Sequence, residues 1–227
     1  MMEFPFQWDD GQFISPFIAS SEEDMEMLAG WLVAPYLTAN TTPNSTATAR
    51  RLEMRLTDLG CGDATALLSL AEYVQKGWQE LGTTVENSSQ RSLHLLITGV
   101  ELDDALLVKA EESAASFAMR VASPTSSPVS AETHFVSVDI RVVDLDVYFP
   151  RRMPCPSLLV STPASPLPPS PPYVLYVYLL PEALETLREK LVEVLCRGWM
   201  VASNRWTIPG LDHLLKERVG HIHIYYQ

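Results

Sequence analysis

The chain has 227 residues, in which 16 Lys and Arg residues stand against 28 Asp and Glu residues for a net charge of −12. Apolar residues make up 47% of the sequence and charged residues 19%, which are globular values and exclude a wholly disordered chain. The longest apolar run, 173–181, has the length of a strand, so we expect no membrane span. The acidic balance also argues against a nucleic-acid-binding surface.

Cysteine usage and the first residues indicate a compartment. Cys61, Cys155 and Cys196 form neither a Cys-x-x-Cys pair nor a Cys/His cluster, which predicts a reduced, cytoplasmic location and no metal site. The opening MMEFPFQWDD lacks the basic and apolar regions of a secretory signal, and it is not the Arg-rich, acid-poor type of a transit peptide.

Four segments rich in proline or small polar residues are predicted to be loops that decorate a single domain over 1–227. Nine of the 17 prolines fall in the last of them, where the missing backbone donors disfavour a regular helix or strand. The four segments lie near 38–49, 82–92, 122–133 and 150–172.

Between these loops, apolar residues recur either at helical spacing or in strand-length runs. In chain order we expect a helix over 20–32, a strand over 52–59, a helix over 63–78, a strand over 93–100, a helix over 103–120, a strand over 135–143, a strand over 173–180, a helix over 181–196, a strand over 199–205 and a closing edge or hairpin strand over 221–226. Ser20 and Glu23 have the spacing of a capping box at the start of the first helix. Val138, Ile140 and Val142 share one face of the predicted third strand.

Strands that alternate with helices predict an α/β fold. The expected sheet is doubly wound, mostly parallel and Rossmann-like, with helices on both faces and an antiparallel C-terminal strand. In such a sheet, ligands bind at the carboxyl ends of the strands, where the strand order reverses. The residues that follow each predicted strand are therefore the candidates for a binding site.

Glycine and acidic residues follow the first three predicted strands. Gly60 and Gly62 let the backbone turn sharply after the first strand and let a ligand approach the main chain. Glu101 follows the second strand, where a carboxylate can accept hydrogen bonds from both hydroxyls of a ribose. Asp144 follows the third strand.

Two cofactors use this arrangement, and the negative charge of the loop decides which of them it can bind. A dinucleotide needs a third glycine, but Thr65 stands at that position, and Asp63 puts negative charge where the phosphates would lie. S-adenosylmethionine has no phosphate and carries a sulfonium and an ammonium group. The acidic loop therefore favours S-adenosylmethionine over NAD.

The stretch RLTDLGCGDA (55–64) resembles motif I of the class I S-adenosylmethionine-dependent methyltransferases, and Glu101 resembles their acidic residue after the second strand. More narrowly, YLLP at 178–181 with the following ALETLREKL, VASNR at 201–205 and PFIASSEE at 16–23 are similar to the small protein-lysine methyltransferases that modify the mitochondrial ADP/ATP translocase and the ATP synthase c subunit. The resemblance implies a protein substrate with an accessible lysine, and it makes the mitochondrion the alternative location.

The resemblance also implies site residues. The cofactor-binding positions it implies are Asp58, Gly60, Cys61, Gly62, Glu101, Asp144, Ser20 and Phe17, and the catalytic positions are Tyr178 and Pro181. Within this set, Asp58 supports the cofactor ammonium through water, the glycine loop lines the methionine part and Glu101 binds the ribose. Asp144 meets the adenine amino group, with Asp139 in its place if the third strand ends earlier. Tyr178 and Pro181 face the methyl group, and Phe17 and Ser20 form a lid.

Two other functions stay open at this point. A small-molecule methyltransferase would close its lid over a small cavity, whereas a protein methyltransferase needs an open, acidic rim. A module that binds S-adenosylmethionine without turnover is favoured by Ala64, which stands where the family has a glycine. No residue stands out as a general base, and methyl transfer from an activated cofactor needs alignment and a neutral amine instead.

Overall fold

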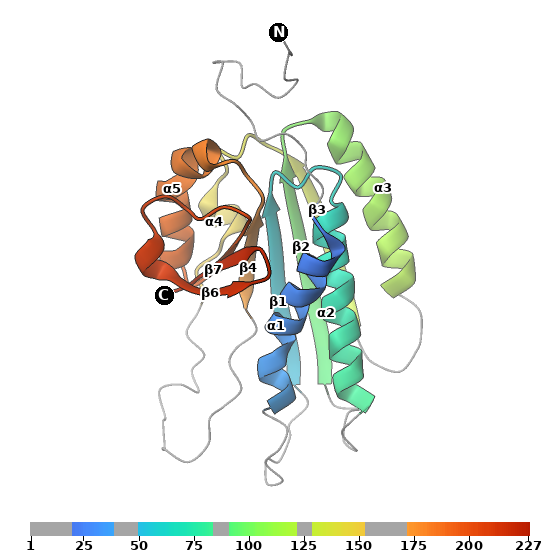
Figure 1. Cartoon of the computed structure of the whole chain (residues 1–227). Helices are drawn as coiled ribbons and strands as arrows, with labels where there is room; N and C mark the ends of the chain where they lie inside the picture. The colour runs from blue at the N-terminus through green and yellow to red at the C-terminus, as the bar shows by residue number, and fades with distance from the viewer. Residues whose placement is uncertain (1–19, 39–49, 84–90, 122–128, 153–171) are drawn as a thin grey trace.

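A computed structural model describes residues 20–38, 50–83, 91–121, 129–152 and 172–227. Its centre is a seven-stranded sheet with the order β3-β2-β1-β4-β5-β7-β6 (Figure 1). The strands are β1 Arg50–Leu59, β2 Arg91–Glu101, β3 Val129–Ser137, β4 Tyr173–Val177, β5 Met200–Asn204, β6 Leu215–Val219 and β7 Ile222–Tyr225. Most of the four predicted loop segments lies outside the described residues.

The pairing of the strands confirms the predicted fold class. β1 pairs in parallel with both β2 and β4, and the parallel arrangement continues outward to β3 on one side and β5 on the other. β7 pairs antiparallel with β5 and with β6, so the C-terminal strands form a hairpin on an otherwise parallel sheet. The strand order reverses between β1 and β4, which makes their carboxyl ends the expected place for a ligand.

Helices cover both faces of the sheet. The helices are α1 Glu22–Thr38, α2 Thr65–Thr83, α3 Asp104–Val121, α4 Leu145–Tyr148 and α5 Pro181–Cys196, with a short 3₁₀ turn at Asp212–Leu214. α1 and α2 lie side by side over one face (Figure 1), and together with α3 they enclose the first apolar core. α4 and α5 enclose the second core on the opposite face.

Alternation along β4 explains how one strand serves both cores. Val174 and Tyr176 belong to the first core, while Leu175 and Val177 belong to the second. α5 begins at Pro181, where a missing N–H costs nothing, and it ends at Cys196 as predicted. Its buried positions recur at helical spacing: Ala183, Leu184, Leu187, Leu191, Val194 and Leu195.

The predicted strand over 135–143 is wrong in position. β3 instead spans Val129–Ser137 and pairs with β2 along that whole length, so the predicted loop over 122–133 also ends too late. After the strand, Val142 N donates to Asp139 O and closes a turn. The alternating valines and isoleucine misled the prediction because this turn buries Ile140 in the second core while Val142 stays 71% exposed.

The start of the first helix is also shifted. α1 begins at Glu22 and continues to Thr38, beyond the predicted end at 32. Ser21 rather than Ser20 caps it, because Ser21 Oγ accepts a hydrogen bond from Asp24 N at 3.1 Å and donates one to Asp24 Oδ2 at 2.7 Å. The strand predicted over 173–180 ends at Val177, and β6 was not predicted because its middle residues are charged and exposed.

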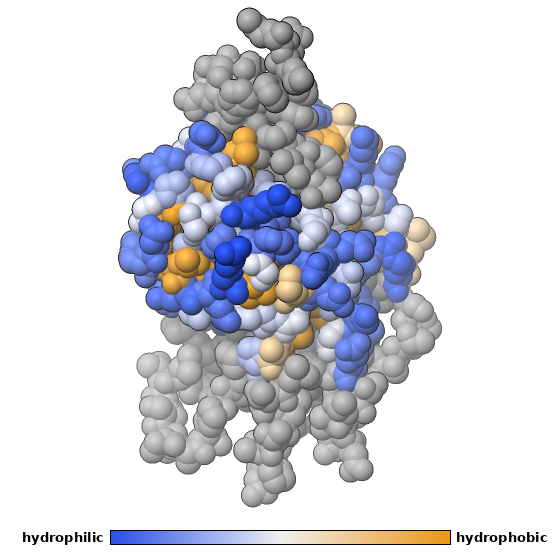
Figure 2. Space-filling model, in the orientation of Figure 1, coloured by the Kyte–Doolittle hydropathy of each residue, from blue (hydrophilic) through white to orange (hydrophobic). Residues whose placement is uncertain are grey.

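The surface carries mostly hydrophilic residues, as a globular chain requires. The described part of the face in Figure 2 is largely hydrophilic, with smaller hydrophobic patches between the hydrophilic residues. Within the described ranges, none of the helices combines the length and apolar composition that a membrane span requires.

Candidate functional site

A tight turn follows β1 at the point where the strand order reverses. Gly60, Gly62 and Ala64 all have positive φ angles, of 81°, 57° and 61°. The N–H groups of Gly60 and Cys61 both donate to Val100 O, at 2.8 and 3.1 Å, and this joins the turn to the end of β2. Glycine suits such a backbone because it lacks a Cβ, whereas Ala64 adopts it at a cost in strain.

Glu101, at the end of β2, holds this turn through hydrogen bonds that we call the Glu101 clasp. Its Oε2 accepts a hydrogen bond from Gly62 N at 2.7 Å, and its Oε1 accepts from Leu102 N at 2.8 Å and from Asp103 N at 3.1 Å. A carboxylate offers about four acceptor positions, so about one is left for a ligand. The sequence predicted where Glu101 lies but not this second role, which needs the tertiary contact between β2 and the turn.

Asp58 is a buried carboxyl group beside that clasp. Its residue is only 3% exposed. Burial raises its pKa well above the usual value, Glu101 raises it further, and no described side chain lowers it. A positive group placed here would stabilise the ionised form, so the site favours a cationic ligand.

Cys61 fills the space under the turn. Its thiol is buried and donates weakly to Gly62 O at 3.8 Å. Burial raises the pKa of the Cys61 thiol, and the neighbouring Asp58 raises it further, so the thiol keeps its proton. Cys61 therefore shapes the turn and is no nucleophile.

A polar cluster lies next to Asp58 across the sheet. Asp58 pairs with Tyr176 in the register of β1 and β4. The Tyr176 hydroxyl lies 2.6 Å from Ser20 Oγ and accepts a hydrogen bond from Asn204 Nδ2 at 2.9 Å. Asn204 Oδ1 is buried and has no hydrogen-bond partner among the described residues. Ser20, which was predicted as part of a lid, is hydrogen-bonded to Tyr176, and Tyr176 in turn is hydrogen-bonded to Asn204 at the end of β5.

Tyr178 and Pro181 follow β4 at the same edge. Tyr178 is half-buried against the first core, and Pro181 is the first residue of α5. Between them, Leu179 lies so close to the turn that a Cβ added at Gly60 would be 3.3 Å from its Cδ2. The end of β4 and the turn are therefore packed together.

The two candidates for the adenine contact, Asp144 and Asp139, both follow β3 in the chain. Asp144 is exposed and caps the short α4, where its Oδ1 accepts from Asp146 N at 2.8 Å. Asp139 is the acidic residue that follows β3, and both of its carboxylate oxygens accept from Arg141: Oδ1 from Nε at 3.1 Å and Oδ2 from Nη2 at 2.7 Å. Because β3 ends at Ser137, Asp139 rather than Asp144 occupies the predicted position after the strand.

Phe17, the other predicted lid residue, lies outside the described residues. In the part of the chain that the structure describes, no group of three or more His, Cys, Asp and Glu side chains is arranged to hold a metal ion.

Comparison with known proteins gives distant structural similarities. No protein-family model and no curated protein matches the chain. It is similar to the crystal structure of an RNA methyltransferase from Salinibacter ruber in complex with S-adenosyl-L-homocysteine, with 16% identity and a TM-score of 0.47 over 92% of this chain and 91% of that one. It is also similar to an S-adenosylmethionine-dependent methyltransferase from Methanosarcina mazei, with 10% identity and a TM-score of 0.32 over 76% of this chain and 73% of that one. Neither similarity is close enough to assign a substrate.

Proposed function

We propose that this protein is an S-adenosylmethionine-dependent methyltransferase that transfers a methyl group to a lysine side chain of a protein. The observation that carries the proposal is the turn after β1, held by Glu101 beside the buried Asp58 carboxyl group at the point where the strand order reverses. This edge of the sheet offers close backbone approach and negative charge together.

The hydrogen bonds of the turn argue against a phosphate-bearing cofactor. Phosphates bind to free N–H groups at the start of a helix. Here Asp63 Oδ1 accepts from Thr65 N at 3.0 Å, and Glu101 Oε2 already accepts from Gly62 N. A pyrophosphate would meet carboxylates at the places where it needs donors, whereas a sulfonium and an ammonium would meet opposite charge.

The residues present fit S-adenosylmethionine. Asp58 would support the ammonium, Gly60 and Gly62 would allow the methionine part to approach the backbone, and the free acceptor position of Glu101 would take a ribose hydroxyl. Asp139 stands where the adenine amino group is expected. When bound, the cofactor supplies a methyl group that is already activated for transfer, so the protein mainly aligns the acceptor and excludes water.

The polar cluster next to Asp58 supports an amine as the acceptor. The unpaired Oδ1 of Asn204 can accept a hydrogen bond from an amine N–H, and the buried ring of Tyr176, whose hydroxyl is bonded to Asn204, would desolvate that amine. Desolvation lowers the pKa of a lysine and favours the neutral amine that must attack. The neutral lysine nitrogen would accept the methyl group that the cofactor supplies, S-adenosylhomocysteine would be left, and the nitrogen would release a proton to solvent. The net charge of −12 steers basic substrates toward the chain.

Labelling with tritiated S-adenosylmethionine in a protein extract tests both parts of the proposal, the methyltransferase activity and the lysine acceptor. The parent should label a protein on lysine, and Asn204→Val should lose labelling while its affinity for S-adenosylhomocysteine stays at the parent value. Label on nucleic acid or on a small molecule would refute the lysine acceptor alone. A parent that binds neither cofactor form would refute the methyltransferase itself.

A further inference from the structure

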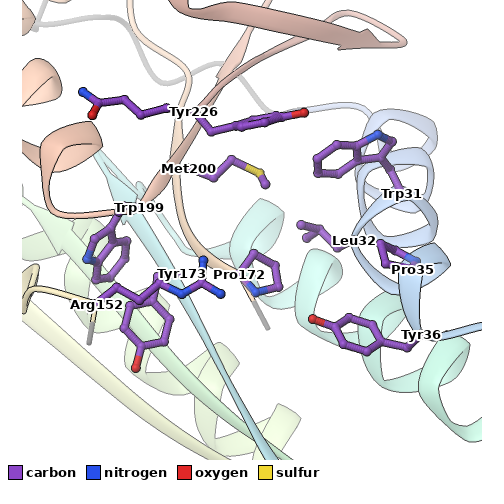
Figure 3. A pocket seen from close by; sticks show the side chains of 12 residues that line it. Trp31, Leu32, Pro35, Tyr36, Arg152, Pro172, Tyr173, Trp199, Met200 and Tyr226 are labelled. Carbon is purple, nitrogen blue, oxygen red and sulfur yellow. The ribbon is translucent and has the colours of Figure 1, made fainter. Parts of the chain in front are cut away.

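A cavity of about 330 Å³ lies at the edge of the sheet opposite the glycine turn (Figure 3). Its lining includes Tyr173 and Met200, the first residues of β4 and β5, whereas the turn follows the last residue of β1. Because these three strands run parallel, the cavity and the candidate cofactor site are at opposite ends of the strands. The cavity is therefore a separate feature that the proposed methyl transfer does not use.

Aromatic and other apolar side chains form most of the walls of the cavity. Five of the lining residues carry aromatic rings: Trp31, Tyr36, Tyr173, Trp199 and Tyr226. Edge-to-face contacts fix three of these rings: the ring centroids of Tyr173 and Trp199 are 5.3 Å apart, and those of Tyr36 and Trp78, which lies outside the cavity, are 5.7 Å apart. A volume of this size suits one small molecule with a flat or apolar body.

The Tyr36 hydroxyl is an unsatisfied donor in this cavity. The residue is 4% exposed, and within the described ranges its hydroxyl has no hydrogen-bond partner. Burial raises the pKa of Tyr36, and Arg152 only partly offsets this, so the hydroxyl keeps its proton. Buried polar groups are usually paired, and an unpaired one indicates that a ligand or water completes it.

Arg152 brings positive charge to the same space. Its guanidinium carbon lies 6.0 Å from the centroid of the Tyr173 ring, and its backbone N–H donates to Arg197 O at 2.9 Å, which fixes the residue beside the cavity. Figure 3 shows the Tyr36 hydroxyl and the Arg152 side chain reaching toward Pro172 from opposite sides. Two groups that donate hydrogen bonds, one of them positively charged, disfavour an ammonium ligand and favour an anion.

We propose that this cavity binds a small amphipathic anion, whose apolar body lies among the aromatic rings and whose single carboxylate or sulfonate group meets Tyr36 and Arg152. The volume and the aromatic walls of the cavity match the apolar body of such a molecule. The two donors, Tyr36 and Arg152, match its anionic group. The proposal does not depend on the methyltransferase activity, because the two sites share no residue.

Fluorescence titration with a matched pair of probes tests the site. 8-Anilinonaphthalene-1-sulfonate carries the anionic group, and N-phenyl-1-naphthylamine is the same aromatic body without it. We expect the parent to bind the sulfonate at one saturable site about tenfold more tightly than the neutral probe, a difference of about 1.4 kcal/mol. Tyr36→Phe and Arg152→Met should each weaken sulfonate binding about three- to tenfold and leave the neutral probe unaffected.

Controls separate this site from general surface binding. Arg151→Met removes a positive charge from the neighbouring exposed position, and Tyr148→Phe removes a hydroxyl outside the cavity, so both should bind the probes as the parent does. Equal affinity of the parent for the two probes would overturn the proposal without any variant. So would an equal loss in the controls, or displacement of the sulfonate by S-adenosylhomocysteine, which would place the probe at the other edge of the sheet.

Discussion

Glu101→Gln tests the clasp between β2 and the glycine turn. The carboxylate accepts three backbone hydrogen bonds, from Gly62 N at 2.7 Å, Leu102 N at 2.8 Å and Asp103 N at 3.1 Å. Glutamine keeps the size of the side chain and one oxygen but replaces the other oxygen with NH₂. If the remaining oxygen stays with Leu102 and Asp103, the NH₂ group faces the Gly62 N–H, donor against donor.

The expected loss follows from those contacts. A buried N–H left without an acceptor costs about 1–3 kcal/mol, and each of the two retained bonds weakens by about 1 kcal/mol when its acceptor loses its charge. Removing the charge also relieves repulsion with Asp58, whose pKa burial and Glu101 both raise. We therefore expect the free energy of unfolding to fall by about 2–4 kcal/mol.

Urea unfolding followed by circular dichroism measures this loss. Glu111→Gln is the matched control, because it removes the same charge from an exposed position on α3 and should change stability by less than about 0.5 kcal/mol. If Glu101→Gln unfolds within about 0.5 kcal/mol of the parent, the clasp does not hold the turn and the reasoning fails.

Four further substitutions can be measured by urea unfolding. The raised pKa of Asp58 means that the parent loses stability as pH rises from the ordinary carboxyl pKa to the raised one, and Asp58→Asn should lack this decline. Burial acts to raise the pKa of Asp24, but its hydrogen bonds outweigh this and lower it, so the parent should lose stability as pH falls through that lowered pKa, and Asp24→Asn should not. Gly99→Ala would place a Cβ 2.7 Å from the Cys61 sulfur and should cost about 1–3 kcal/mol. Gly30→Ala on α1, where a Cβ meets nothing within 4 Å, should instead gain about 0.5–1 kcal/mol. A flat pH profile in the parent, or equal effects of the two alanines, would contradict these assignments.

Local sequence patterns predicted the backbone elements that surround the site. The spacing of Gly60 and Gly62 after an apolar strand was enough to place the turn, and Glu101 was placed at the end of β2 because its strand is strongly apolar. Pro181 fixed the first residue of α5 because proline suits that position.

Features that depend on contacts distant in sequence were not predictable. The hydrogen bond between Ser20 and Tyr176 joins residues 156 positions apart, so no local pattern reports it. The apolar alternation after Ser137 has the period of a strand, but Ile140 is buried by a turn against the second core. The cavity beneath Tyr36 arises only where α1, β4 and β5 meet.

A crystal structure in the presence of S-adenosylhomocysteine tests the central claim most directly. The account predicts the nucleoside across the carboxyl ends of β1 and β2, with a ribose hydroxyl on Glu101 and the amino group of the ligand near Asp58. Density for the ligand at another place, or an unchanged turn with no ligand at saturating concentration, would contradict it.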